Sequence, residues 1–80
     1  MKPEFWLDET NGTVRQVNGL TAVEYHFFSL KDAKKARTIM YNYVERWAKK
    51  KNKEPLYPEH LVQECAKNGI NIIHVQAGRA

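Results

Sequence analysis

Residues 11–28 read NGTVRQVNGLTAVEYHFF, and this stretch decides the fold. It contains two Asn-Gly pairs, Asn11-Gly12 and Asn18-Gly19, each set between segments rich in Val, Thr and aromatic residues. Asn and Gly tolerate the positive φ of tight hairpin turns, so an Asn-Gly pair between apolar segments is a strong hairpin signal. Two such pairs predict a three-stranded antiparallel meander.

The strands of this meander are expected over residues 5–8, 13–17 and 20–28. In the third strand, two sets of side chains alternate with a period of two, which is typical of a strand with one buried face. We expect the apolar set to face the core and the other set to face away from it. The apolar set is Val23, Tyr25 and Phe27, and the opposite set is Ala22, Glu24 and His26.

A long helix is expected directly after the meander. Ser29 is a good N-cap residue, and Asp32 three positions later supplies a weaker form of the capping box. From Leu30 onward, apolar residues recur at spacings of three and four, so one face is apolar to about Ala48. The stripe comprises Leu30, Ala33, Ala36, Met40, Tyr43, Val44 and Trp47. The lysine run that follows favours the negative helix C-terminus, and the helix is expected to end before Pro55.

The rest of the chain predicts a short helix and a final strand. Pro58 suits the first position of a helix, and Gly69 suits the left-handed residue that ends one. Residues 70–76 (INIIHVQ) then predict a largely buried strand, and residues 77–80 a frayed tail. The expected fold class is α+β in the order β-β-β-α-α-β: a small antiparallel meander packed on a long basic helix, followed by a short helix and a final strand.

Length and composition limit what the protein is expected to be. Eighty residues suggest one domain over residues 1–80, and 42% hydrophobic residues suffice for one small core. No apolar run approaches the roughly 20 residues of a membrane span, and no secretory signal is apparent, so we expect a cytoplasmic protein without membrane contact. A single cysteine, Cys65, and three scattered histidines favour neither a disulfide nor a metal site, and no cofactor is expected.

The positive charge is concentrated in one segment. Residues 31–53 contain nine basic residues and two acidic ones, whereas the segments before and after carry a small negative balance. On the expected helix the basic residues fall mainly away from the apolar stripe, which gives a one-sided basic ridge of the kind that binds phosphates. The candidate nucleic-acid-binding residues are Lys31, Lys34, Lys35, Arg37, Tyr41, Arg46, Lys49, Lys50, Lys51 and Lys53.

Two aromatic residues lie off the expected apolar faces. Tyr41 is placed beside Lys34 and Arg37, where its ring stacks on a base, anchors a protein interface or lies over the core edge. Trp6 alternates with Phe5 and Leu7, so it faces away from the core unless another element covers it. In topology alone, a meander followed by a long helix resembles DNA-binding domains that lay a small sheet in the major groove. Arg15 is the one basic residue in the predicted strands, so the helix is the expected contact.

Two functions remain open at this point. The first is a small non-catalytic protein that binds nucleic acid through the basic ridge. The alternative is a small inhibitor or adaptor that docks the same ridge on an acidic protein surface; a solvated lysine face would give the same charge pattern. Enzyme activity is not expected, because Ser29 is explained as a cap, Cys65 as a core residue and the His60–Glu64 pair as a surface ion pair. The sequence leaves the oligomeric state undetermined.

Overall fold

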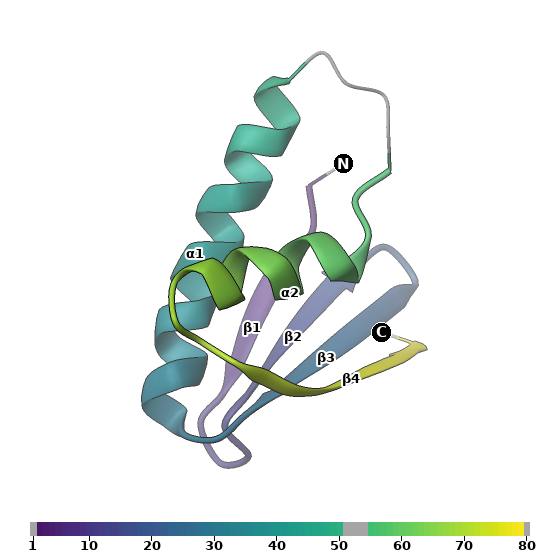
Figure 1. The fold of residues 1–80 in the computed structure, drawn as a ribbon. Coiled ribbons are helices and arrows are strands. Elements are labelled where there is room, and N and C mark those ends of the chain that lie inside the picture. Colours follow the sequence, from purple (N-terminus) through teal and green to yellow (C-terminus); the bar gives the residue numbers. More distant parts are fainter. Residues whose placement is uncertain (1, 51–54, 80) are drawn as a thin grey trace.

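The computed structural model describes residues 2–50 and 55–79, in which three strands precede two helices and a last strand. The elements are β1 (Glu4–Asp8), β2 (Thr13–Asn18), β3 (Thr21–Phe27), α1 (Leu30–Lys49), α2 (Pro58–Lys67) and β4 (Ile72–Arg79) (Figure 1). The predicted α+β class and the element order β-β-β-α-α-β are therefore confirmed. Neither helix in the described part of the chain combines the length and apolarity needed to cross a membrane.

The strands form one antiparallel sheet in the order β1-β2-β3-β4. The register pairs Trp6 with Arg15 between β1 and β2, and Val14 with Tyr25 between β2 and β3. On the far side of β3, Tyr25 pairs with Val75 of β4. The edges of the sheet are therefore β1 and β4, which come from opposite ends of the sequence.

The turn between β2 and β3 differs in detail from the expected one. Asn18 is the last residue of β2 and pairs with Thr21, so the loop consists of Gly19 and Leu20. Gly19 has φ +66°, as the first loop residue of a type II′ turn requires, whereas no described residue other than glycine has a positive φ. The Asn-Gly pair thus marked the turn correctly, but the glycine alone supplies the left-handed backbone. Leu20 and Phe28, predicted as strand residues, lie outside β3 and are exposed.

The start of α1 and the end of α2 show the local chemistry that the sequence indicated, whereas α1 ends at Lys49, earlier than expected. The Ser29 hydroxyl accepts a hydrogen bond from the backbone N–H of Asp32 at 3.1 Å, which confirms Ser29 as the N-cap of α1. Beyond α2, Gly69 has φ +77° and its N–H donates to the carbonyl of Ala66. The N–H of Ile70 donates to the carbonyl of Cys65, which completes a Schellman motif and turns Ile70 into the core.

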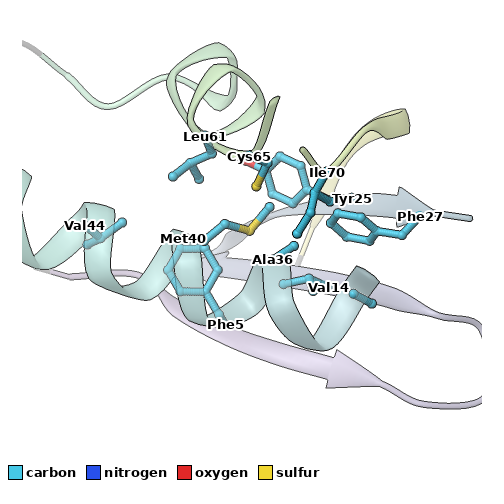
Figure 2. Close-up of a cluster of buried hydrophobic side chains, with 11 residues drawn as sticks. Phe5, Val14, Tyr25, Phe27, Ala36, Met40, Val44, Leu61, Cys65 and Ile70 are labelled. Carbon is cyan, nitrogen blue, oxygen red and sulfur yellow. The ribbon is translucent and has the colours of Figure 1, made fainter. Parts of the chain in front are cut away.

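The core lies between the sheet and the two helices, which both cover the same face of the sheet (Figure 1). Side chains from β1, β2, β3 and both helices meet around Met40, which is fully buried (Figure 2). One polar pair lies inside: the Tyr25 hydroxyl donates to Oε1 of Gln16 at 2.6 Å, so neither buried group lacks a partner. The cluster comprises Phe5, Val14, Tyr25, Phe27, Ala33, Ala36, Met40, Val44, Leu61, Cys65 and Ile70.

The prediction for the last strand is wrong in its limits and in its burial. We expected a largely buried strand over residues 70–76 and a frayed tail after it, but β4 runs from Ile72 to Arg79 and is exposed after its first residue. Of this segment, only Ile70 and Ile72 at its start reach the core. The apolar sequence was misleading because β4 pairs with β3 on one side only, while α1 packs on the other three strands.

Candidate nucleic-acid interface

The solvent-facing side of α1 carries lysines at both ends of the helix, three in its first two turns and two at its C-terminus. Ala33, Ala36, Met40 and Val44 are the buried residues of this helix, and the lysines occupy positions on the remaining surface. We call the five exposed lysines that the structure describes on α1 and at its C-cap the basic face: Lys31, Lys34, Lys35, Lys49 and Lys50. Lys51 and Lys53, which the sequence also placed in the site, lie outside the described residues.

Two carboxylates near α1, Glu45 and Glu64, are paired away from the basic face, whereas Asp32 in its first turn forms no ion pair with a described residue. Glu45 accepts from Nζ of Lys2 at 3.1 Å, and Glu64 of α2 accepts from Nη2 of Arg46 at 2.9 Å. Across residues 2–50 and 55–79, no carboxylate lies within ion-pair distance of a lysine of the basic face. The positive charge of this face is therefore not neutralised by the described side chains.

Arg46 is placed differently from the five lysines. Its guanidinium binds Glu64 and lies over the ring of Tyr43, 5.6 Å from the ring centroid. These two contacts fix Arg46 between α1 and α2, so a phosphate that approached it would compete with Glu64. The sequence indicated that Arg46 was basic and off the apolar stripe, but its pairing depends on how α2 packs against α1.

α1 passes beside β1 (Figure 1). A groove lies between these two elements. Its volume is about 430 Å³, and its lining combines the buried side chains of Phe5 and Val44 with exposed aromatic and charged residues. Trp6 and Tyr41 contribute from the strand and the helix, with 60% and 55% of their surface exposed. The complete lining is Lys2, Pro3, Glu4, Phe5, Trp6, Arg37, Tyr41, Val44 and Glu45.

Arg37 connects the helix to the strand at this groove. Its Nε donates to the backbone carbonyl of Phe5 at 2.9 Å. This bond uses one of the five N–H donors of the guanidinium, and no described residue accepts from its terminal NH₂ groups. The arrangement holds a positively charged, planar group at the groove while leaving donors for a ligand.

Tyr41 stands between two hollows of the surface. The groove lies on its β1 side, and a second hollow of about 370 Å³, lined by Arg37, Thr38, Tyr41 and Asn42, lies along the helix. With 55% of its surface exposed, Tyr41 is accessible to a ligand and is not part of the buried core. The structure also brings Tyr41 and Trp6 to one groove, which helical or strand periodicity could not predict because it depends on how α1 crosses the sheet.

The sheet face opposite the helices has mixed charge. The register places one row across the four strands: Trp6, Arg15, Glu24 and Gln76. Nη2 of Arg15 donates to the backbone carbonyl of Arg79 at 2.7 Å. Arg79 is the last residue of β4, although the sequence predicted that it lies in a frayed tail. In the next row, the ring centroids of His26 and His74 lie 5.3 Å apart. The sequence does not predict this contact, because it depends on the register of β4 against β3. This face lacks the concentrated positive charge of α1.

The remaining chemically reactive groups have structural roles. His60 Nδ1 accepts from the backbone N–H of Tyr57 at the start of α2, and its ring lies 4.9 Å from that of Trp47. Cys65 is buried, and its burial, followed by the charge of Glu64, raises the pKa of the thiol to about 11. The predicted ion pair between His60 and Glu64 does not form, because Glu64 pairs with Arg46. The described residues hold no cluster of three or more His, Cys, Asp or Glu side chains suited to a metal ion.

No known protein family, curated protein or solved structure matches this chain. The functional assignment therefore rests on the surface of α1 and on the groove beside it.

Proposed function

We propose that this protein binds nucleic acid through the basic face of α1. The observation that supports the proposal most directly is that, within the described residues, the five exposed lysines at the two ends of α1 have no acidic partner. Exposed lysines bind phosphates by releasing condensed counterions, which supplies most of the affinity of non-specific binding. A carboxylate paired with these lysines would reduce this gain; Glu45 and Glu64 are paired elsewhere, and Asp32 of the first turn forms no ion pair with a described lysine.

The proposal is tested by replacing Lys34, Lys35, Lys49 and Lys50 together with Ala. These side chains are exposed and Ala is a good helix former, so the fold is expected to remain intact. Affinity should fall alike for random-sequence duplex DNA, single-stranded DNA and RNA. The slope of log K against log salt should also flatten, by about 0.9 per lost contact on duplex DNA and about 0.7 on single strands.

A charge-matched comparison separates the basic face from net charge. Lys67→Ala removes one positive charge from α2, where Lys67 lies 3.9 Å from Glu64, and Lys34→Ala removes one from the basic face. We expect the salt slope to change for Lys34→Ala and to stay close to wild type for Lys67→Ala. Equal changes would show that net charge alone determines binding.

The same lysines would serve the alternative function, docking on an acidic protein surface. A wild-type protein that binds none of the three nucleic acids at low salt, measured up to millimolar concentration, would contradict the proposal. The quadruple-lysine variant would then be the control in a search for an acidic protein partner.

A further inference from the structure

Two large, exposed aromatic residues are among those that line one groove. Trp6 of β1 and Tyr41 of α1 come from elements far apart in the sequence, and both line the groove of about 430 Å³. Small-molecule sites commonly occupy about 300–1,000 Å³ and combine apolar walls with a few polar groups. We infer that this groove holds one unpaired base of a single-stranded nucleic acid, an inference that rests on the proposed function.

The chemistry of the groove suits a base joined to a phosphate. Its interior is apolar at Phe5 and Val44, and the exposed aromatic rings offer faces for stacking. Arg37 lines the groove and Lys34 lies one turn before it on α1, so both offer positive charge to a phosphate beside the base. Of the two carboxylates in the lining, Glu45 is paired with Lys2, and Glu4 is exposed. Because every base has a π face, this mode of binding predicts weak dependence on sequence.

The bases of a duplex cannot use this groove. Both faces of each paired base are covered by its neighbours in the stack, so an aromatic side chain reaches only a base that is unpaired. The basic face alone would attract duplexes and single strands through their phosphates. The groove therefore predicts a preference for single strands that the lysines by themselves do not explain.

A peptide strand paired with the edge of β1 is less compatible with the structure. Such a strand must donate to the outward carbonyl groups of β1. The carbonyl of Phe5 already accepts from Nε of Arg37, and Pro3 precedes β1 without an N–H to donate. At Phe5, the edge of β1 thus presents a guanidinium where a paired strand would need a free carbonyl.

Trp6 provides a direct probe of the groove. Trp6 and Trp47 are the only tryptophans, so the Trp47→Phe variant leaves Trp6 as the sole tryptophan. The melting temperature of this variant is measured first, to check that the fold is retained. This variant is titrated with a 10-nucleotide oligo-dT, with a duplex of the same length, and with an oligonucleotide of the same length that lacks its bases. We expect quenching of Trp6 by oligo-dT, with little quenching by the duplex or the abasic strand at equal saturation.

Substitution of Tyr41 tests the second wall of the groove. Tyr41→Ala should weaken binding of oligo-dT by about 5- to 150-fold while leaving the salt slope unchanged, because stacking is lost and no charge is removed. Tyr57→Ala is the matched control, since Tyr57 has the same exposed fraction, 55%, but lies at the start of α2 outside the groove. It should bind oligo-dT as the wild type does.

The outcomes separate this inference from the proposed function. If the quadruple-lysine variant loses binding but Tyr41→Ala and Tyr57→Ala behave alike, the base site is overturned and the proposed function stands. Equal affinity for duplex and single strand, or equal quenching by the abasic strand, also overturns the base site. If the wild type binds no nucleic acid, both proposals fall.

Discussion

The edge strands β1 and β4 close the same sheet but differ in what lies beside their outer backbone. At β1, Arg37 of α1 binds the carbonyl of Phe5, and the groove with Trp6 and Tyr41 follows the strand. β4 is exposed after its first residue, and the apolar Ile73 and Val75 are 51% and 38% exposed. Among the described residues, the one side chain that binds the backbone of β4 is that of Arg15, at Arg79.

This difference shows that a helix beside an edge strand changes the function open to that edge. α1 packs against β1, β2 and β3, whereas α2 packs on β4. The first arrangement turns an edge into a groove with fixed side chains. The second leaves a long edge of low charge, which proteins usually protect with Lys, Pro or a short strand.

The largest effect is expected where β1 enters the core. Phe5 is 5% exposed and lies in the main cluster. Phe5→Ala should lower the free energy of unfolding by about 3–5 kcal/mol, because it removes buried apolar surface and leaves a cavity. Urea denaturation followed by circular dichroism measures this loss. A loss below 1 kcal/mol would mean that β1 is not held to the core as described.

Alkaline pH tests the packing on the β4 side of the molecule. Burial raises the pKa of the Cys65 thiol on α2 from 9.0 to about 11, and burial also raises that of Tyr25, which pairs with Val75. The folded protein therefore favours the neutral thiol over the thiolate. The contribution of this thiol to the free energy of unfolding is fully present below pH 9 and is lost as the pH rises through about 11. The free energy of unfolding should fall by an amount on the order of 2 kcal/mol over this range.

Denaturation curves at several pH values between 8 and 11 measure this decline. Cys65→Ala is the control, because it lacks the ionisable thiol and should decline less steeply relative to its own stability at pH 8. If the wild type and the variant decline in parallel, the thiol is accessible to water and α2 packs more loosely than in the structure.

The boundary between α2 and β4 should respond more moderately. Gly69 has φ +77°, and there is open space where a Cβ would lie, so the cost of a side chain comes from the backbone alone. Gly69→Ala should destabilise the protein by about 1 kcal/mol. Thermal melting of the two proteins side by side is sufficient, and an unchanged melting temperature would rule out the left-handed cap.

The smallest effect is expected on β4 itself. Val75→Ala should change stability by less than about 0.5 kcal/mol, because the side chain remains partly in water. The same substitution at Val14, which is fully buried in β2, should cost about 2 kcal/mol or more. Equal costs in denaturation experiments would show that the outer part of β4 is covered in solution.

The parts of the fold that the sequence predicted correctly depend on local chemistry. Gly19 marked the hairpin, Ser29 began α1 and Gly69 ended α2, because turns and caps are decided by a few neighbouring residues. The burial of β4, in contrast, depends on its position in the sheet and on which helix covers it. An apolar run does not reveal whether a strand lies at the centre or at the edge of a sheet, so INIIHVQ was assigned to the interior.

The candidate site was predictable to a similar extent. Helical periodicity placed the lysines of the basic face on the surface, as the structure describes them. It could not show that Glu64 engages Arg46, or that Trp6 and Tyr41 share a groove, because both depend on contacts between elements distant in the sequence. Charge patterns are thus readable along one helix, whereas composite sites require the packing of two elements.

The pairing of β4 with β3 also bears on the order in which the chain folds. β1, β2 and β3 are joined by short loops, so their hairpins close at low entropic cost. β4 reaches β3 only after both helices have been traversed, and this pairing links Phe27 to Ile72 across the longest loop in the sheet. We expect the meander and α1 to form the folding nucleus and β4 to dock late, which would make the solvent-exposed edge the last part of the sheet to assemble.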